Sequence, residues 1–114
     1  MSELKEMRCE ACAPGAPPAS AEERERFGAE IPEWEITEED GQERLRRVFR
    51  FPEYAAAVEF TRRVAEIAEQ EGHHPAILLE WGRVTVSWWT HAIGGLHRND
   101  FIMAARTDAL RKGE

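Results

Sequence analysis

The segment from residue 53 to residue 71 constrains the fold most, because it is the clearest amphipathic helix in the sequence. Pro52 suits the start of this helix, and Gly72 suits the left-handed residue that often follows a helix end. The segments before and after it both have the character of strands. The apolar face of the helix recurs at helical spacing through Tyr54, Ala57, Val58, Thr61, Val64, Ala65, Ile67 and Ala68.

Two hairpins are predicted, one on each side of this helix in the chain. Residues 34–37 and 44–51 form the first, and residues 76–81 and 84–91 form the second. Gly82-Arg83 fits a two-residue turn of type II′, with glycine at the first central position. Along residues 84–91 alternate side chains share a face, so the strand has an apolar side and a polar side.

Two further helices complete the pattern. Ser20 and Glu23 have the spacing of a capping box, so a helix is expected to begin at Ser20 and to end at Pro32. A final helix is expected from about residue 97 to residue 112. The order α-β-β-α-β-β-α predicts an α+β fold, in which a four-stranded antiparallel sheet carries three helices on one face. Residues 20–114 would form this single domain.

Residues 1–19 are predicted to be a flexible tail, because proline, glycine and alanine give them no periodic apolar pattern. The tail carries Cys9 and Cys12, a CxxC pair. Zinc would need two more ligands, and a redox pair would normally lie at a helix start in a thioredoxin-like context. Two reduced thiols in a reducing cytoplasm are the expected state.

Charge narrows the classes of partner. The 114 residues include 22 acidic and 15 basic side chains, which gives a formal charge of −7. Nucleic acids and anionic membranes are bound through clustered lysine and arginine, so neither is expected as a direct partner. No apolar run approaches the length of a membrane span, and no secretory signal is recognisable. A cytoplasmic location is therefore expected.

All four histidines lie between residues 73 and 97. Pro75 favours an extended conformation for His74, and neighbouring side chains of an extended segment point apart. His91 comes at the end of the last predicted strand. His73, His74 and His91 could therefore meet near the end of the long helix.

Three interpretations of these histidines compete. They could be surface or cap residues, as single histidines usually are. Three histidines could also hold a catalytic zinc ion, although adjacent histidines rarely bind one ion together and no pair has i,i+4 spacing. Metal-free acid–base catalysis is the third interpretation, because histidine titrates near neutrality and two neighbours resist double protonation.

Nearby residues bear on this choice. Glu69 lies one turn before His73, and Asp100 lies in the first turn of the last helix, where a carboxylate is favoured. Either could orient an imidazole or bind a polar ligand, although Glu69 could be merely solvated and Asp100 merely a cap. Trp34 could stack on a flat ligand or fill the core.

The motifs of this region resemble the pterin-4a-carbinolamine dehydratase family over roughly residues 20–111. The run Trp88-Trp89-Thr90-His91, residues 95–105 and the CxxC tail are most similar to a proteobacterial branch that often accompanies phenylalanine hydroxylase. The resemblance is carried by Glu69, by His73-His74-Pro75, by Thr90-His91, by Gly95-Leu96 and by Asp100.

The resemblance implies a carbon–oxygen lyase that dehydrates a 4a-hydroxytetrahydropterin to the quinonoid dihydropterin and water. The pterin is the substrate, and no metal or other cofactor is implied. As a set, the histidines would carry out the acid–base steps: His73, His74 and His91. The remaining residues would orient the histidines, bind the pterin or shape the pocket: Glu69, Asp100, Trp34, Pro75 and Thr90.

The resemblance also implies an assembly in which two sheets join across a two-fold axis, as a homodimer or homotetramer. Departures from the family pattern concern His97, which replaces a Ser or Thr cap, and the pair Trp88-Trp89, which replaces smaller residues. His97 is expected to be structural, Trp88 to face the core, and Trp89 to line an interface or the pocket rim. The alternatives to catalysis are a dimerisation or regulatory partner, and a pterin-binding protein of molybdopterin metabolism.

Overall fold

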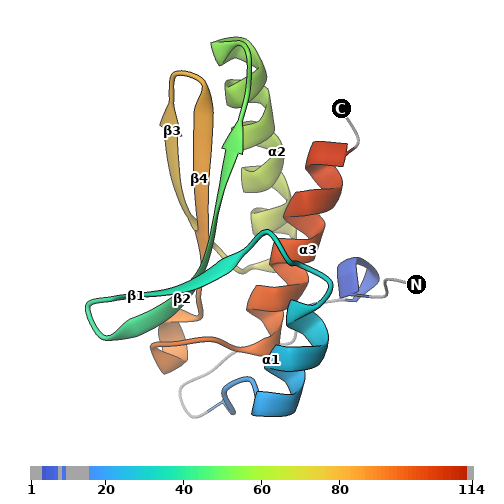
Figure 1. Cartoon of the computed structure of the whole chain (residues 1–114), viewed down its shortest axis with the longest axis vertical. Coiled ribbons are helices and arrows are strands. Elements are labelled where there is room, and N and C mark those ends of the chain that lie inside the picture. Colours follow the sequence, from blue (N-terminus) through green and yellow to red (C-terminus); the bar gives the residue numbers. More distant parts are fainter. Residues whose placement is uncertain (1–3, 8, 10–15, 113–114) are drawn as a thin grey trace.

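The structure, a computed structural model, describes residues 4–7, 9 and 16–112. The helices and strands follow the predicted order, with two additional 3-10 turns (Figure 1). Among the described residues, no helix has both the length and the hydropathy that crossing a bilayer requires. The elements are η1 (Leu4–Glu6), α1 (Ala21–Gly28), β1 (Glu35–Glu39), β2 (Gln42–Arg50), α2 (Tyr54–Glu71), β3 (Ala76–Glu80), β4 (Arg83–Trp88), η2 (His91–Ile93) and α3 (Arg98–Lys112).

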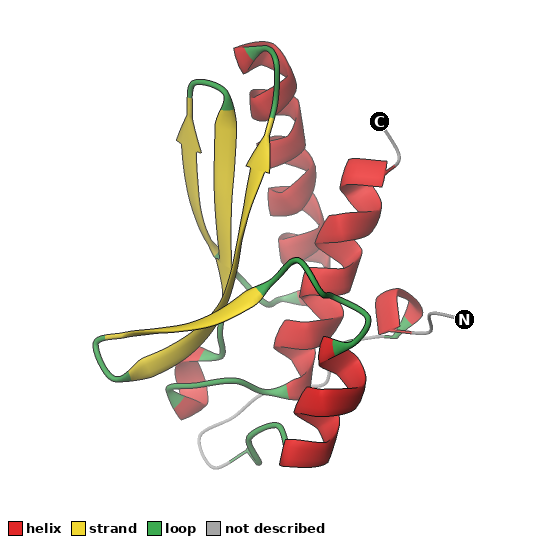
Figure 2. Ribbon diagram, in the orientation of Figure 1, coloured by secondary structure: helices red, strands yellow, loops and turns green. Residues whose placement is uncertain are grey.

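The four strands form one antiparallel sheet in the order β1-β2-β4-β3. The two hairpins therefore join through β2 and β4, where Leu45 pairs with Trp88. Figure 2 shows the helices gathered on one side of this sheet, as the sequence predicts. The α+β class and the α-β-β-α-β-β-α order are both confirmed.

The core lies between the sheet and the helices. On β4, Val84, Val86 and Trp88 alternate toward the helices and are buried, and on β2 Leu45 and Phe49 do the same. Burial of this apolar surface is the main favourable term in folding. The helices contribute Phe27, Ala57, Phe60, Val64, Ala68, Phe101, Ile102, Met103 and Ala104 to the same core.

Local sequence signals fix the start of α1 and the end of α2 as expected, whereas α1 ends at Gly28 and not at Pro32. The Ser20 hydroxyl accepts a hydrogen bond from the Glu23 amide at 3.1 Å, and the Glu23 carboxylate accepts one from the Ser20 amide at 3.0 Å. This is the predicted capping box. Gly72 follows α2 with φ of 63°, the left-handed conformation that glycine adopts without a steric cost.

The turns and strand ends differ from the prediction in both hairpins. In the first, β1 ends at Glu39 and β2 begins at Gln42, so the strands extend closer to the turn than predicted. In the second, Glu80 pairs with Arg83, so the turn residues are Trp81 and Gly82, and glycine occupies the second central position rather than the first. The prediction of a type II′ turn at Gly82-Arg83 is therefore wrong. Strand β4 also ends at Trp88, and His91 opens the turn η2 instead of closing the strand.

The N-terminal segment also differs from expectation, in the part that the structure describes. Leu4 is fully buried, and its amide donates to Glu30 Oε1 at 3.2 Å. Arg106 donates to the carbonyl oxygen of Met7 at 2.7 Å, and the Cys9 amide donates to Glu71 Oε1 at 3.0 Å. The described residues of the expected tail thus pack against α2 and α3, whereas Cys12 lies outside the described residues.

This packing predicts that Leu4→Ala destabilises the protein by about 2–3 kcal/mol, because it empties a fully buried site. Leu78→Ala is the matched control, since Leu78 is exposed, and it should change stability by less than about 0.5 kcal/mol. Urea unfolding followed by circular dichroism measures both. Equal stability of Leu4→Ala and the wild type would show that the N-terminal segment does not pack as described.

Candidate active site

The backbone that carries His73 is fixed by the end of α2. The Gly72 amide donates to the carbonyl oxygen of Glu69 at 3.3 Å, and the His73 amide donates to that of Ala68 at 3.1 Å. These two bonds form a Schellman motif, which satisfies the last carbonyl groups of a helix. Pro75 then leads the chain into β3. His73 is therefore held at a defined position beside the helix end.

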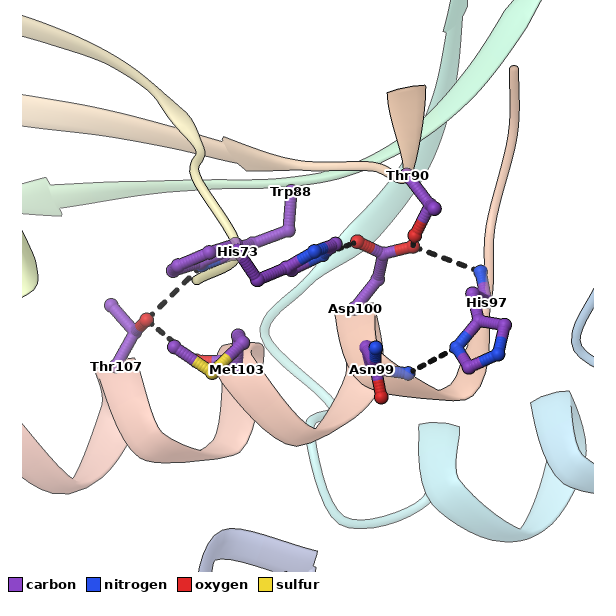
Figure 3. A network of polar contacts seen from close by, with 8 residues as sticks. All are labelled: His73, Trp88, Thr90, His97, Asn99, Asp100, Met103 and Thr107. Carbon is purple, nitrogen blue, oxygen red and sulfur yellow. Dashed lines mark hydrogen bonds and ion pairs between the residues drawn. The ribbon is translucent and has the colours of Figure 1, made fainter. Parts of the chain in front are cut away.

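Asp100 is the centre of the polar network in Figure 3. Its carboxylate is fully buried, and Oδ1 lies 2.7 Å from His73 Nε2. Oδ2 accepts from the Thr90 hydroxyl at 2.8 Å and from the His97 amide at 2.9 Å. A buried carboxylate needs partners of this kind, because removing it from water is otherwise costly. The carboxylate thus ties α3 to the segments that follow α2 and β4.

His97 directly precedes α3, which begins at Arg98, and is held by a pair of bonds. Its Nδ1 accepts from the Asn99 amide at 3.0 Å, while its own amide donates to Asp100. The pair resembles a capping box, except that the imidazole bonds the amide of the second helical residue and not that of the third. Asp100 accordingly caps the helix and contacts His73 with the same carboxylate.

His74 points away from His73, as adjacent residues of an extended segment should. Its side chain is 62% exposed, and Nε2 lies 3.0 Å from Oε1 of Glu69, itself 82% exposed. Glu69 and His74 therefore form a pair at the surface end of α2. Each of the two adjacent histidines has its own carboxylate, one buried and one in solvent.

His91 lies in different surroundings. It is exposed, and its ring centroid lies 4.5 Å from that of Trp89. The Arg44 guanidinium covers the Trp89 ring at 3.9 Å from the centroid, a cation–π contact. Among the described residues, no carboxylate contacts His91. Trp89 is buried beneath these two side chains, and its place at an interface or pocket rim stays a prediction.

The three histidines are connected through their sequence neighbours and through Asp100. His73 and His74 are adjacent, Thr90 and His91 are adjacent, and Asp100 hydrogen-bonds to both His73 and Thr90. An isolated bridge from Thr90 to Gly95 closes the turn that carries His91. Among the described residues, the side chains of His73 and His74 bond to carboxylates and not to another histidine.

Trp34 does not contact these residues. It is buried, its Nε1 donates to Asp108 Oδ1 at 2.9 Å, and its ring packs edge-on against Phe49. Arg47 donates to the same carboxylate at 2.7 Å. This placement fits the core-filling alternative, and contact of Trp34 with a ligand stays a prediction.

Two residues near His73 were not singled out from the sequence as neighbours of the site. The Trp88 indole lies nearly parallel to the His73 imidazole, and Thr107 hydrogen-bonds to that indole. Thr107 follows Asp100 by seven residues on α3, two helical turns, so the two share a helix face. That spacing is the sequence signal that could have identified Thr107.

A metal centre has no obvious place among these residues. In the part of the chain that the structure describes, no three His, Cys, Asp or Glu side chains are grouped so that they could hold an ion. What the arrangement does offer is imidazoles held by carboxylates, together with an imidazole on an aromatic surface. Such groups are suited to moving protons at neutral pH.

Relatives of known family align with almost the whole chain. A protein from Chlorobium limicola is 58% identical over 113 residues, covering 99% of this chain and 100% of its own length. One from Syntrophotalea carbinolica is 59% identical over 110 residues, covering 96% and 98%. Both names assign these proteins provisionally to pterin-4-alpha-carbinolamine dehydratase.

Solved structures share the fold. A transcriptional coactivator/pterin dehydratase from Brucella melitensis has a TM-score of 0.74 and 28% identity, covering 82% of this chain and 98% of that one. A pterin dehydratase-like protein described as a RuBisCO assembly factor in the alpha-carboxysome has a TM-score of 0.57 and 27% identity, covering 68% and 87%.

The family model described as "Pterin 4 alpha carbinolamine dehydratase" matches residues 17–110. This range includes every residue of the histidine and carboxylate network described above. With this match and relatives above 50% identity over nearly the full length, the chain belongs to the pterin 4 alpha carbinolamine dehydratase family.

Proposed function

We propose that the protein dehydrates a 4a-hydroxytetrahydropterin to the quinonoid dihydropterin and water, by acid–base catalysis with His73, His74 and His91. The observation that carries the proposal is the buried bond between His73 and Asp100. A buried carboxylate in contact with an imidazole fits a proton-transfer role for that imidazole better than a merely structural one. Family membership and the names of the relatives support the same reaction.

The reaction has two proton movements. The hydroxyl on the tetrahedral ring carbon leaves as water after it gains a proton, and the neighbouring ring nitrogen loses a proton. Both steps need groups that can hold and release a proton near neutral pH, and each can be accelerated by roughly 10²–10⁴-fold. Imidazole is the side chain best suited to that task.

The surroundings of the histidines support their use as a set. When His73 is neutral and its Nε2 carries the proton toward Asp100, Nδ1 is left as a proton acceptor. When His73 is protonated, the Asp100 carboxylate stabilises the positive charge. His74 and His91 are exposed, so they can approach a ligand directly. Glu69 would orient His74, and Thr90 and Pro75 would shape the walls beside them.

The setting of the reaction is part of the proposal. Dehydration would return the pterin to the cycle that supports aromatic amino acid hydroxylation, including the phenylalanine hydroxylase step, in the cytoplasm. The enzyme would need no metal or other cofactor. A homodimer or homotetramer would complete the sheet.

A binding role is the second candidate. It is favoured by the solved protein of this fold that is described as a RuBisCO assembly factor. In the part of the chain that the structure describes, α1, α2 and α3 lie on one side of the sheet and leave its opposite face uncovered (Figure 2). A dimerisation partner, or a pterin-binding protein of molybdopterin metabolism, would need the fold but not the proton-transfer groups. Kinetics of the histidine variants separate these roles from catalysis.

The direct test generates the substrate with a pterin-dependent hydroxylase and follows its decay with and without this protein. We expect faster decay with the protein than by spontaneous dehydration, and the same rate after exhaustive treatment with a chelator. If the protein did not accelerate the decay, the proposed enzymatic activity would be contradicted. Activity lost to the chelator and restored by zinc would contradict the metal-free mechanism.

Individual histidines should matter to the rate. His74→Ala and His91→Ala are each expected to lower kcat at least about tenfold, because each removes a proton-transfer group. The matched control is Glu66→Gln, one turn before the site on α2, where the exposed carboxylate pairs with Arg62. That variant should keep the wild-type rate. If either alanine variant matched the control, that histidine would have no catalytic role.

Asp100→Asn should cost both stability and activity. The amide cannot accept all three bonds of the buried carboxylate, so we expect a loss of about 3 kcal/mol in unfolding free energy. Asp108→Asn is the control, since Asp108 is a carboxylate on the same helix that accepts hydrogen bonds from Trp34 and Arg47. It should lower stability and leave kcat unchanged. Equal kcat in the two variants would show that Asp100 is purely structural.

A further inference from the structure

We propose that Thr107 and Trp88 are positioning residues for His73: the Thr107 hydroxyl fixes the Trp88 indole, and the flat face of the indole fixes the plane of the imidazole. This inference rests on the proposed function, in which His73 transfers a proton. Neither residue would touch the substrate. Both would act through His73, from the side of the core.

The first contact is a hydrogen bond between two buried side chains. Trp88 Nε1 donates to Thr107 Oγ1 at 3.1 Å, and Thr107 Oγ1 donates to the carbonyl oxygen of Met103 at 2.7 Å. Trp88 and Thr107 are both fully buried. A hydroxyl has one proton to give, so donation to Met103 turns a lone pair of the oxygen toward the indole. The indole is thereby held in one orientation.

The second contact is a stack. The ring centroids of His73 and Trp88 lie 5.7 Å apart and the ring planes differ by 7°. The bond from His73 Nε2 to Asp100 fixes one edge of the imidazole but still allows the ring to turn about that bond. A flat surface alongside the ring removes this freedom. The edge and the plane of His73 are therefore held by two different residues.

Both constraints come from one helix. Asp100 holds His73 directly, and Thr107 holds it through Trp88, from positions about 10 Å apart along α3. Figure 3 shows both sets of contacts: Asp100 lies beyond one edge of His73, and Thr107 lies beyond Trp88. Because a helix is rigid over two turns, the angle and the position of the imidazole are set together.

Core packing alone does not require this bond. Valine has nearly the shape of threonine and would fill the same space without burying a hydroxyl. Leucine or phenylalanine would fill the place of Trp88 without a buried N–H group that needs a partner. The polar pair is specifically suited to fixing the rotation of the indole, and the indole lies against His73, the buried member of the three proposed catalytic histidines.

The experiment compares Thr107→Val, which removes the hydroxyl, with Thr107→Ser, which keeps it. Thr61→Val is the matched control, because the Thr61 hydroxyl donates to the Ala57 carbonyl at 2.9 Å in the same i−4 manner but has no indole partner. The measurements are kcat and KM for the dehydration, the tautomer and ring signals of His73 from long-range ¹H–¹⁵N spectra, and circular dichroism to confirm folding.

We expect Thr107→Val to lower kcat about tenfold with KM nearly unchanged, less than the roughly hundredfold that a 1 Å misplacement can cost. In the spectra, His73 should keep its tautomer, because its bond to Asp100 remains, while its ring signals shift or broaden as the imidazole turns about that bond. Thr107→Ser should restore both properties, and Thr61→Val should alter neither. If Thr107→Val does not fold, Trp88→Phe replaces it, since phenylalanine keeps an aromatic face and lacks the N–H group.

Wild-type kcat in folded Thr107→Val, or an unchanged His73 spectrum, would overturn the proposal. So would an equal loss in Thr107→Val and Thr107→Ser, because loss of the indole bond would then not be the cause. Failure of the proposed function gives a different result, because the wild type itself would then not accelerate dehydration. In that case Thr107 and Trp88 have no positioning role in catalysis, even if the spectra confirm their contact with His73.

Discussion

The buried carboxylate of Asp100 is the interaction on which the site depends. A charge removed from water is tolerated only where hydrogen bonds replace its solvation, and here His73, Thr90 and the His97 amide supply them. The three donors come from the ends of three different elements. The requirement to satisfy one carboxylate therefore brings the end of α2, the end of β4 and the start of α3 to one place.

The fold gives this carboxylate a rigid base. Helix α3 is buried along much of its length, and its residues Phe101, Ile102 and Met103 belong to the core. Side chains that project from it are held more precisely than side chains on a loop. His74 and His91 lie on the solvent side of this base, so the site combines a fixed buried imidazole with two that are accessible.

The sequence predicts most of the fold, because its signals are local. The capping box at Ser20, the left-handed residue Gly72 and the alternation along β4 each depend on a few neighbouring residues. The pairing of Glu69 with His74 follows from the same local spacing. The turn at Trp81-Gly82 was misplaced by one residue, since glycine suits either central position and only the pairing of Glu80 with Arg83 decides between them.

Local sequence patterns do not predict contacts between residues that lie far apart in the chain. Burial of Leu4 depends on α3, at the other end of the chain, and the stack of Trp88 on His73 depends on sheet register. Helix α3 contacts η1, α1, α2, β2 and β4, so elements from both halves of the described chain share one core with it. Neither half therefore has a complete core of its own. We expect the domain to unfold in one cooperative transition, with no stable half left folded.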